Sequence, residues 1–258
     1  MRVVIKIGTS TLAHANGRLN IRRVEELCKV ISDLKNSGYE IILVSSGAIG
    51  MGVGKLSLKE KPQDIPTKQA AAAVGQCELM YTYDRLFQKY HHTVAQILLT
   101  GSDFKNDDRY HNFQNTLGRL LELEVLPIIN ENDTIATEEI KVGDNDTLSA
   151  MVAASVGADC LVLLSDIDGL YTADPHKCAD AKLIHNVKEL TPEIMALAGD
   201  AGSALGTGGM KTKLHAAELC RDAECEMVIL NGAEPNLLYD LFEGKEVGTR
   251  FFAKGDRA

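Results

Sequence analysis

Short apolar runs alternate with helix-like segments along this chain of 258 residues. The clearest run spans residues 160–164 and is apolar at every position, which is typical of a strand buried on both faces of a sheet. By contrast, residues 19–37 repeat apolar side chains at helical spacing and stop before Gly38, as an amphipathic helix does. Strands that alternate with such helices predict a mostly parallel sheet covered by helices on both faces.

The same criteria assign most other segments. Further strands are predicted at residues 2–7, 40–44, 93–100, 125–129 and 227–230. Further helices are predicted at residues 68–88, 110–124, 149–157, 210–222 and 237–242. No shift in composition marks a second domain, and one α/β domain of this length is ordinary. We therefore predict a single domain over residues 1–258.

Composition and charge exclude several classes of protein. The net charge is −9 and the basic residues form no stripe, so nucleic acid is a poor partner on electrostatic grounds. No apolar run is long enough for a membrane helix, and the chain begins with a strand-like run rather than a signal peptide. The six cysteines include no C-x-x-C pair, so neither a zinc site nor a disulfide framework is expected. These features predict a soluble, cytoplasmic protein.

Four of the cysteines lie in apolar segments that read as helices or strands. They are Cys28, Cys77, Cys160 and Cys220. A free cysteine in such a segment packs as a small hydrophobic side chain, so we expect all four to be buried.

A lysine near the end of the first strand is the first candidate for chemistry. Lys6 interrupts the apolar run at residues 2–7, and a buried lysine is costly unless its charge is matched. An edge strand with a solvated lysine would also explain it. The alternative is that Lys6 faces a bound phosphate, with Gly8 allowing close backbone approach and the amides of Thr9 and Ser10 adding donors.

A turn of small residues follows the second strand. Residues 45–52 read SSGAIGMG, and a strand, a small-residue turn and a helix in succession present backbone amides to an anion. The segment is neither a G-x-G-x-x-G fingerprint nor a Walker loop. A purely structural tight turn would account for Gly47, but less easily for Ser45 and Ser46 beside it.

Polar residues are densest after the strand at residues 125–129. Residues 130–133 read NEND, and residues 143–146 read GDND before a helix-like segment. Each Asn or Asp alone is more often a turn residue or a helix cap than a ligand. Their density, and a second polar strand end at Ser165 and Asp166, favour a ligand site at the C-terminal edge of the sheet, where open α/β folds bind ligands.

Two lysines open the predicted helix at residues 210–222. Lys211 and Lys213 lie in its first turn, where cations oppose the helix dipole. An anion close to the helix start would explain this arrangement, and two solvated surface lysines would explain it equally well.

Seven motifs occur in an order that resembles one family. They are VVIKIGTS, VSSGAI, KQAAAAVGQ, PIINENDT, EIKVGDNDTLSA, LLSDIDGLYTADP and GTGGMKTK. Together they extend over almost the whole chain and resemble the glutamate 5-kinases of the amino-acid kinase superfamily. The pairing of INEND with IKVGDND is the most specific part, whereas the first lysine and the glycine loop are shared more widely.

The resemblance implies a three-layer αβα sandwich, amino-acid kinase-like, around a largely parallel sheet of about eight strands. It implies ATP-dependent phosphorylation of the side-chain carboxylate of L-glutamate to L-glutamyl 5-phosphate, the first step of proline biosynthesis. Implied cofactors and partners are ATP, Mg²⁺ held mainly by phosphates and water, proline as a feedback inhibitor, and further copies of the chain in a dimer or tetramer. Many members carry a C-terminal PUA domain, and we expect none here. Hand-off of the product to glutamyl phosphate reductase is a further expectation.

The resemblance also implies roles for individual residues. The catalytic residues would be Lys6, Lys213 and Asp146, with Asp146 holding the two ammonium groups in place. The residues that would bind glutamate are Ser46, Gly47, Asn130, Asp133, Asp144 and Asn145. The residues that would bind ATP are Lys6, Gly8, Thr9, Ser165, Asp166, Thr207, Gly208, Gly209, Met210, Lys211, Thr212 and Lys213. No side chain is assigned to magnesium.

Two alternatives stay open at this point. A sister kinase acting on N-acetylglutamate, aspartate or UMP would have the same fold. The two acids of GDND favour a substrate with a free amino group, however, and the motifs hold no arginine for a nucleotide phosphate. A non-catalytic amino-acid sensor would also have this fold, although both lysines and Asp146 are present.

Overall fold

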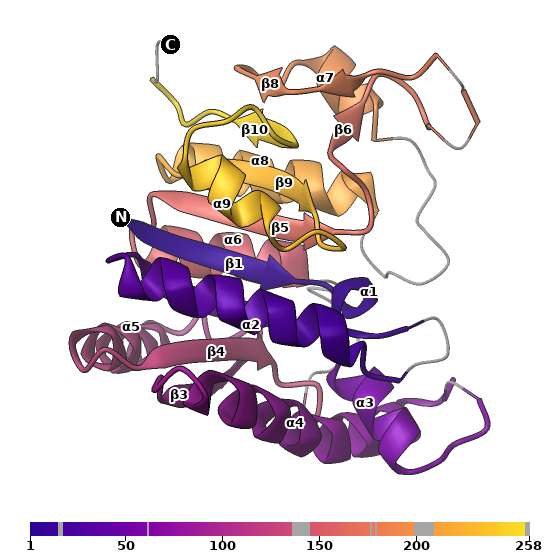
Figure 1. The fold of residues 1–258 in the computed structure, drawn as a ribbon, viewed down its shortest axis with the longest axis vertical. Helices are drawn as coiled ribbons and strands as arrows, with labels where there is room; N and C mark the ends of the chain where they lie inside the picture. The colour runs from indigo at the N-terminus through magenta and orange to yellow at the C-terminus, as the bar shows by residue number, and fades with distance from the viewer. Residues whose placement is uncertain are drawn as a thin grey trace.

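An eight-stranded sheet forms the centre of the computed structural model (Figure 1). The structure describes residues 1–14, 18–60, 62–135, 145–175, 177–178, 180–198 and 209–255. The strands of the sheet are β1 (Arg2–Ile7), β2 (Glu40–Ser45), β3 (Val94–Leu99), β4 (Leu126–Glu131), β5 (Cys160–Ser165), β8 (Asn186–Val187), β9 (Glu226–Asn231) and β10 (Thr249–Phe251). They lie in the order β3-β4-β2-β1-β5-β9-β10-β8.

The pairing in this sheet is parallel between its described neighbours, except that β9 and β10 are antiparallel. A separate antiparallel pair consists of β6 (Leu170–Tyr171) and β7 (Leu183–Ile184). The mostly parallel sheet that the sequence predicts is therefore confirmed.

Helices cover both faces of the sheet. In chain order they are α1 (Thr9–Leu12), α2 (Ile21–Asn36), α3 (Ala48–Lys55), α4 (Ile65–Gln88), α5 (Asp107–Glu122), α6 (Asn145–Ser155), α7 (Pro192–Ala196), α8 (Met210–Asp222) and α9 (Leu237–Phe242). Buried apolar residues of α2, α4 and α9 pack on one face, and those of α5, α6 and α8 pack on the other. Figure 1 shows α2 and α9 in front of the sheet and α6 and α8 behind it. The predicted αβα sandwich is confirmed.

The alternation of side chains along β1 decides where Lys6 points. Val3, Ile5 and Ile7 lie in the apolar cluster with α2, α4 and α9, whereas Val4 lies in the cluster with α5, α6 and α8. Because successive strand residues face opposite sides of a sheet, Lys6 shares the face of Val4. In addition, β1 lies between β2 and β5, so the edge-strand explanation of Lys6 is wrong.

Two glycines let α3 and α4 pack closely beside the end of β2. A Cβ atom on Gly52 would lie 1.8 Å from the Ala71 carbonyl oxygen, and one on Gly75 would lie 1.8 Å from the Ala48 carbonyl oxygen. Neither position has room for a side chain. Because α3 starts directly after Gly47, this contact fixes the loop that links α3 to β2.

Helices α4 and α5 begin earlier than the sequence pattern predicts, as does α6, which starts at Asn145 instead of residue 149. Helix α4 starts at Ile65 instead of residue 68, because the Asp64 side chain accepts a hydrogen bond from the Thr67 backbone N–H and caps the helix. Helix α5 starts at Asp107 instead of residue 110, because Asn106 caps it in the same way. In both cases a side-chain cap extends the helix beyond its apolar repeat.

The cysteines require one correction. Cys28, Cys160 and Cys220 are buried as predicted, but Cys77 is exposed. Successive helix residues point about 100° apart, so Cys77 turns away from the buried face of α4 that Gln76 occupies. Separately, none of the helices in the described ranges is long and apolar enough to cross a membrane.

Candidate active site

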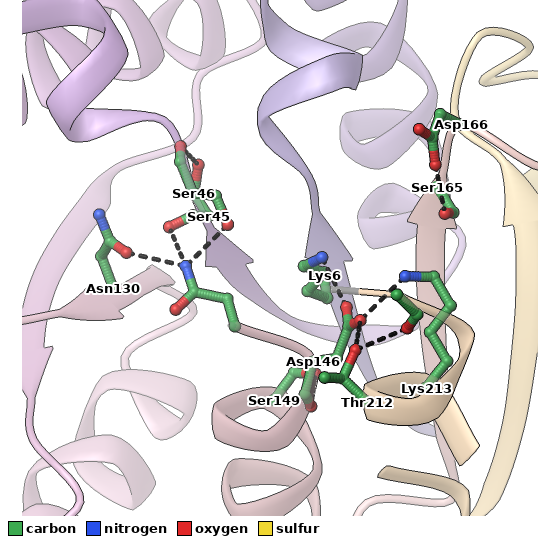
Figure 2. A network of polar contacts seen from close by, with 12 residues as sticks. Lys6, Ser45, Ser46, Asn130, Asp146, Ser149, Ser165, Asp166, Thr212 and Lys213 are labelled. Atoms are coloured by element: carbon green, nitrogen blue, oxygen red, sulfur yellow. Dashed lines mark hydrogen bonds and ion pairs between the residues drawn. The ribbon is translucent and has the colours of Figure 1, made fainter. Parts of the chain in front are cut away.

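Two lysines and one aspartate form a buried ion cluster near the C-terminal end of β1. The Lys6 Nζ lies 2.5 Å from Asp146 Oδ1, and the Lys213 Nζ lies 2.9 Å from Asp146 Oδ2. The Asp146 side chain is 0% exposed, and the Lys6 and Lys213 side chains are 10% and 6% exposed. Figure 2 shows both ammonium groups directed at the carboxylate. We refer to these three side chains as the ion cluster.

Three elements that are far apart in the chain bring the ion cluster together. Lys6 is the penultimate residue of β1, Asp146 the second residue of α6, and Lys213 the fourth residue of α8. Helices α6 and α8 pack against each other on the face toward which Lys6 points. The Thr212 hydroxyl lies 3.1 Å from Asp146 Oδ2 and 2.8 Å from the Gly209 carbonyl oxygen, so it ties the start of α8 to α6.

The three side chains of the ion cluster carry more positive than negative charge. Counted among these three alone, two ammonium groups and one carboxylate leave one net positive charge. Burial raises the pKa of Asp146, but the attraction of Lys6 and Lys213 outweighs burial and holds this pKa below its ordinary value. The carboxylate is therefore ionised at neutral pH. A buried excess of positive charge favours a bound anion, and both phosphate and carboxylate groups accept charge-assisted hydrogen bonds from ammonium groups.

A second network starts from the residue next to Asp146. The Asn145 Nδ2 lies 3.0 Å from the Ser45 carbonyl oxygen, 2.8 Å from Ser46 Oγ and 2.9 Å from Asn130 Oδ1. Asn145 thus reaches the ends of β2 and β4, whereas Asp146 reaches β1 and α8. The first turn of α6 joins the two halves of the candidate site.

Helix α4 supports this network with two buried side chains. Gln76 Oε1 accepts a hydrogen bond from Asn130 Nδ2 at 2.9 Å, and the Tyr83 hydroxyl lies 2.9 Å from Ser45 Oγ. Gln76 and Tyr83 are not among the predicted site residues. A signal was present, because positions 72, 76, 79 and 83 share one buried face of the helix and Gln76 places an amide on it.

The residues predicted to bind ATP lie at the ends of β1 and β5 and at the start of α8. Gly8 follows β1, and a Cβ atom there would lie 3.7 Å from the Lys6 Nζ. Ser165 ends β5, the strand beside β1, and its hydroxyl lies 3.1 Å from an Asp166 carboxylate oxygen. Gly209 is the N-cap residue of α8.

The two lysines of the first turn of α8 have different surroundings. Lys213 is buried and paired with Asp146, whereas Lys211 is exposed. Lys211 is therefore a solvated surface lysine, whereas Lys213 is a buried lysine whose charge is matched by Asp146. Met210 and Thr212 lie in the same turn, and Thr9 lies in the short helix α1.

Most of the remaining predicted residues are those expected to bind glutamate. Gly47 has a φ of +100°, a left-handed conformation that favours glycine, and it is the N-cap residue of α3. Asp133 is half-buried in the loop after β4, and it makes no hydrogen bond or ion pair with any residue that the structure describes. Burial raises the pKa of Asp133. Asp144, Thr207 and Gly208 lie outside the described residues.

Comparison with known proteins identifies the family. Residues 1–231 match the amino acid kinase family. Curated relatives named glutamate 5-kinase include one from Clostridium perfringens, 51% identical over 98% of this chain and 96% of its own length. Another, from Clostridium tetani, is 54% identical over 97% of this chain and 94% of its own length. A third, from Caldanaerobacter subterraneus, is 51% identical over 97% of this chain, which spans 68% of that protein.

Solved structures support the fold assignment. Carbamate kinase from Giardia lamblia bound to AMP-PNP superposes with a TM-score of 0.70 at 19% identity and covers 98% of both chains. UMP kinase from Bacillus anthracis superposes with a TM-score of 0.66 at 16% identity, over 97% of this chain and 95% of that one. At such low identity these two structures establish the fold alone. Together with the family match and the identities of about half to the curated relatives, they show that this chain belongs to the amino acid kinase family and, within it, to the glutamate 5-kinases.

Proposed function

We propose that this kinase transfers the γ-phosphoryl group of ATP to the side-chain carboxylate of L-glutamate, giving L-glutamyl 5-phosphate in the first step of proline biosynthesis. The relatives from the two Clostridium species are named glutamate 5-kinase, and each matches nearly the full length of this chain. The observation that carries the proposal is the buried ion cluster, whose excess positive charge lies at the sheet edge where the strands end.

The acceptor group of glutamate needs no activation by a base. Its side chain has an ordinary pKa near 4.3, so it is already a carboxylate at neutral pH. The obstacle is that this anion must approach a triphosphate, which is also an anion. Catalysis by this chain would therefore consist of positioning the two anions and neutralising their charge.

The ion cluster supplies charge neutralisation in this proposal. Lys6 would contact the transferred phosphoryl group, and Lys213 would contact the phosphates from the nucleotide side. Asp146 would hold both ammonium groups, which is consistent with each lysine contacting a different oxygen of its carboxylate. A preorganised cluster of this kind stabilises charge in the transition state without first having to rearrange.

Glutamate would bind on the other side of the first turn of α6. The side chains of Ser46, Asn130, Asn145 and Asp133 and the backbone of Gly47 are our proposed contacts, together with Asp144. Carboxylate and amide oxygens suit the α-ammonium group of an amino acid, and backbone N–H groups suit its α-carboxylate. The half-buried Asp133, which has no partner among the described residues, supports this placement.

ATP would lie over the end of β1, beside β5 and the start of α8. Gly8 lies beside the Lys6 ammonium group, since a Cβ atom at this position would lie 3.7 Å from the Lys6 Nζ. Ser165 and Asp166 would contact the nucleoside, and residues 207–213 would contact the phosphates. Thr9 would add a backbone donor near the same phosphates.

Magnesium would bind mainly to the phosphates of ATP and to water. The acidic side chain of the ion cluster already pairs with two lysines. In the ranges that the structure describes, no three His, Cys, Asp or Glu side chains converge on one point. This donor set fits an ion that keeps its waters and takes few protein ligands, as Mg²⁺ does with nucleotides. When bound, the ion would neutralise phosphate charge.

Several expectations about regulation and assembly stay predictions. They are feedback inhibition by proline, a dimer or tetramer, hand-off to glutamyl phosphate reductase, a cytoplasmic location, and a single domain over residues 1–258.

An acyl-phosphate trap tests the proposed function. The protein is incubated with ATP, Mg²⁺ and hydroxylamine, and with L-glutamate, N-acetylglutamate, L-aspartate or UMP in parallel. We expect the hydroxamate to form with L-glutamate at a much higher rate than with the other two carboxylic acids, and no ATP-dependent product to form with UMP. A preference for another acceptor would show that the chain has the activity of a sister kinase. No transfer to any acceptor would favour an amino-acid sensor.

A further inference from the structure

The amide of Asn145 has only one orientation that satisfies its neighbours. Its Nδ2 lies within hydrogen-bond distance of the Ser45 carbonyl oxygen, Ser46 Oγ and Asn130 Oδ1. The backbone carbonyl can only accept, so the NH₂ group must point at it. The Asn145 Oδ1 therefore faces the other way. Among the described residues this acceptor oxygen has no hydrogen-bond partner, in a side chain that is otherwise buried.

Asn130 is held in one orientation as well. The Glu131 backbone N–H donates to Asn130 Oδ1 at 2.8 Å, and Asn130 Nδ2 donates to Gln76 Oε1 at 2.9 Å. Gln76 Nε2 in turn lies 3.3 Å from Gln96 Oε1 on the edge strand β3. If the Gln76 oxygen were absent, the Asn130 NH₂ group would be buried without an acceptor, a cost that favours displacement of the Asn130 side chain from this position.

Gln76 is buried on α4, with 8% of its surface exposed, so the contact with Asn130 is shielded from water. Seven residues later on the same helix face, Tyr83 contacts Ser45, whose carbonyl oxygen also receives a hydrogen bond from Asn145. Helix α4 thus holds the Asn145 amide through both Asn130 and Ser45.

We propose that Gln76 is a positioning residue that determines specificity for an amino-acid substrate. By accepting from Asn130, it fixes the chain of amides so that Asn145 presents a carbonyl oxygen to the bound substrate. A carbonyl oxygen matches the N–H donors of a free α-ammonium group. A substrate without that group leaves the acceptor unmatched. This inference rests on the proposed function, because it assumes that glutamate binds beside Asn145.

The test compares L-glutamate with glutarate, which has both carboxylates and no amino group. The hydroxamate assay gives kcat and KM for both acids with the wild-type protein, Gln76→Met and Gln76→Glu. In Gln76→Met we expect the KM for glutamate to rise about tenfold with kcat little changed, since a hydrogen bond to a charged group is lost. The kcat/KM for glutarate should stay the same, so the preference for glutamate falls about tenfold.

Gln76→Glu should restore the preference, because a carboxylate accepts from Asn130 and the exposed Gln96 can turn its amide to donate. Gln88→Met is the matched control, since Gln88 is an exposed glutamine on the same helix, and its preference should equal that of the wild type. Unfolding in urea verifies that each variant folds. Gln76→Ala replaces Gln76→Met if the latter does not fold.

Equal losses on glutamate and glutarate in Gln76→Met would overturn the inference and leave the proposed function intact. The same holds if Gln76→Glu behaves like Gln76→Met. If the wild-type protein forms no hydroxamate from glutamate, the proposed function is wrong and the inference fails with it.

Discussion

Lys6 and Lys213 contact different oxygens of one carboxylate, at 2.5 Å and 2.9 Å, although they come from opposite ends of the chain. The shared partner, Asp146, keeps two like charges close together in a site that is nearly closed to water. A bound anion would complete the charge balance. This relationship makes the ion cluster both a catalytic device in our proposal and a structural risk, because removing Asp146 leaves two buried ammonium groups without their shared counter-charge.

Replacing either lysine should reduce turnover. Lys6→Met and Lys213→Met keep much of the side-chain volume and remove the ammonium group. We expect kcat to fall about 100-fold or more for each, as when one preorganised charge donor is lost. The hydroxamate assay at saturating ATP and glutamate measures the change. Lys29→Met, on the exposed side of α2, is the control and should retain wild-type kcat. A wild-type rate in Lys6→Met would refute its catalytic assignment.

The ion cluster should make stability depend on acid pH. Because the pKa of Asp146 is lower in the folded protein than its ordinary value of 3.8, the unfolded chain takes up the proton first. The stabilisation from Asp146 is therefore complete well above pH 3.8 and is lost as the pH falls toward the lowered pKa. Urea unfolding at a series of pH values measures this loss.

Asp146→Asn is the comparison for that experiment. It should lower the free energy of unfolding at neutral pH by about 3–5 kcal/mol, since two buried ammonium groups lose their counter-charge. Its stability should also fall less steeply with acid. An identical acid dependence in both proteins would show that Asp146 is not the responsible group.

Asp133 should control glutamate affinity in a pH-dependent way. Burial raises its pKa, so it takes up a proton at a higher pH than an ordinary aspartate. If its carboxylate binds the α-ammonium group, the KM for glutamate should rise as the pH falls, while the KM for ATP stays constant. Asp133→Asn should have a high KM for glutamate. The pH dependence that this variant retains measures the protonation of glutamate itself, and the additional dependence of the wild type is the part due to Asp133. A change confined to ATP binding would contradict the placement of this loop.

The hydroxyl of Tyr83 should stabilise the fold and the glutamate side of the site. Tyr83→Phe removes the buried contact with Ser45 and should lower the free energy of unfolding by about 1–2 kcal/mol. Because Ser45 also anchors Asn145, the KM for glutamate should rise as well. Tyr81→Phe makes the same change at an exposed tyrosine of the same helix and should leave both quantities unchanged. Equal effects of the two substitutions would argue against the contact.

Gly75 should be required for the close packing of α3 on α4. An alanine in a helix usually stabilises it by up to about 1 kcal/mol relative to glycine. Here the added methyl group would lie 1.8 Å from the Ala48 carbonyl oxygen, so we expect Gly75→Ala to destabilise the protein by about 1–3 kcal/mol. Gly118→Ala in α5, where no described residue beyond the adjacent helix backbone comes within 4 Å of the added group, should be neutral or stabilising. Thermal unfolding of both variants shows whether each substitution lowers or raises the stability of the protein.

The sequence by itself determined the order and type of the main elements. Apolar runs and helical repeats predict the sheet and its two helix layers, since burial of one face requires that spacing. They also locate the polar residues at strand ends, such as Ser46, Asn130 and Ser165. Helix starts were less accurate, because Asp64 and Asn106 extend α4 and α5 through caps that the apolar repeat does not include.

Only the tertiary structure decided which of these residues meet. Asp146 and Lys213 are separated by 67 positions, and their contact depends on α6 and α8 packing on the face of β1 that carries Lys6. The apolar pattern could not distinguish the buried Lys213 from the exposed Lys211 in the same helix turn, nor reveal that Gln76 orients Asn130. The physical reason is that sequence spacing encodes which face of an element is buried, whereas contacts between elements depend on the order of strands in the sheet and on the packing of helices against it.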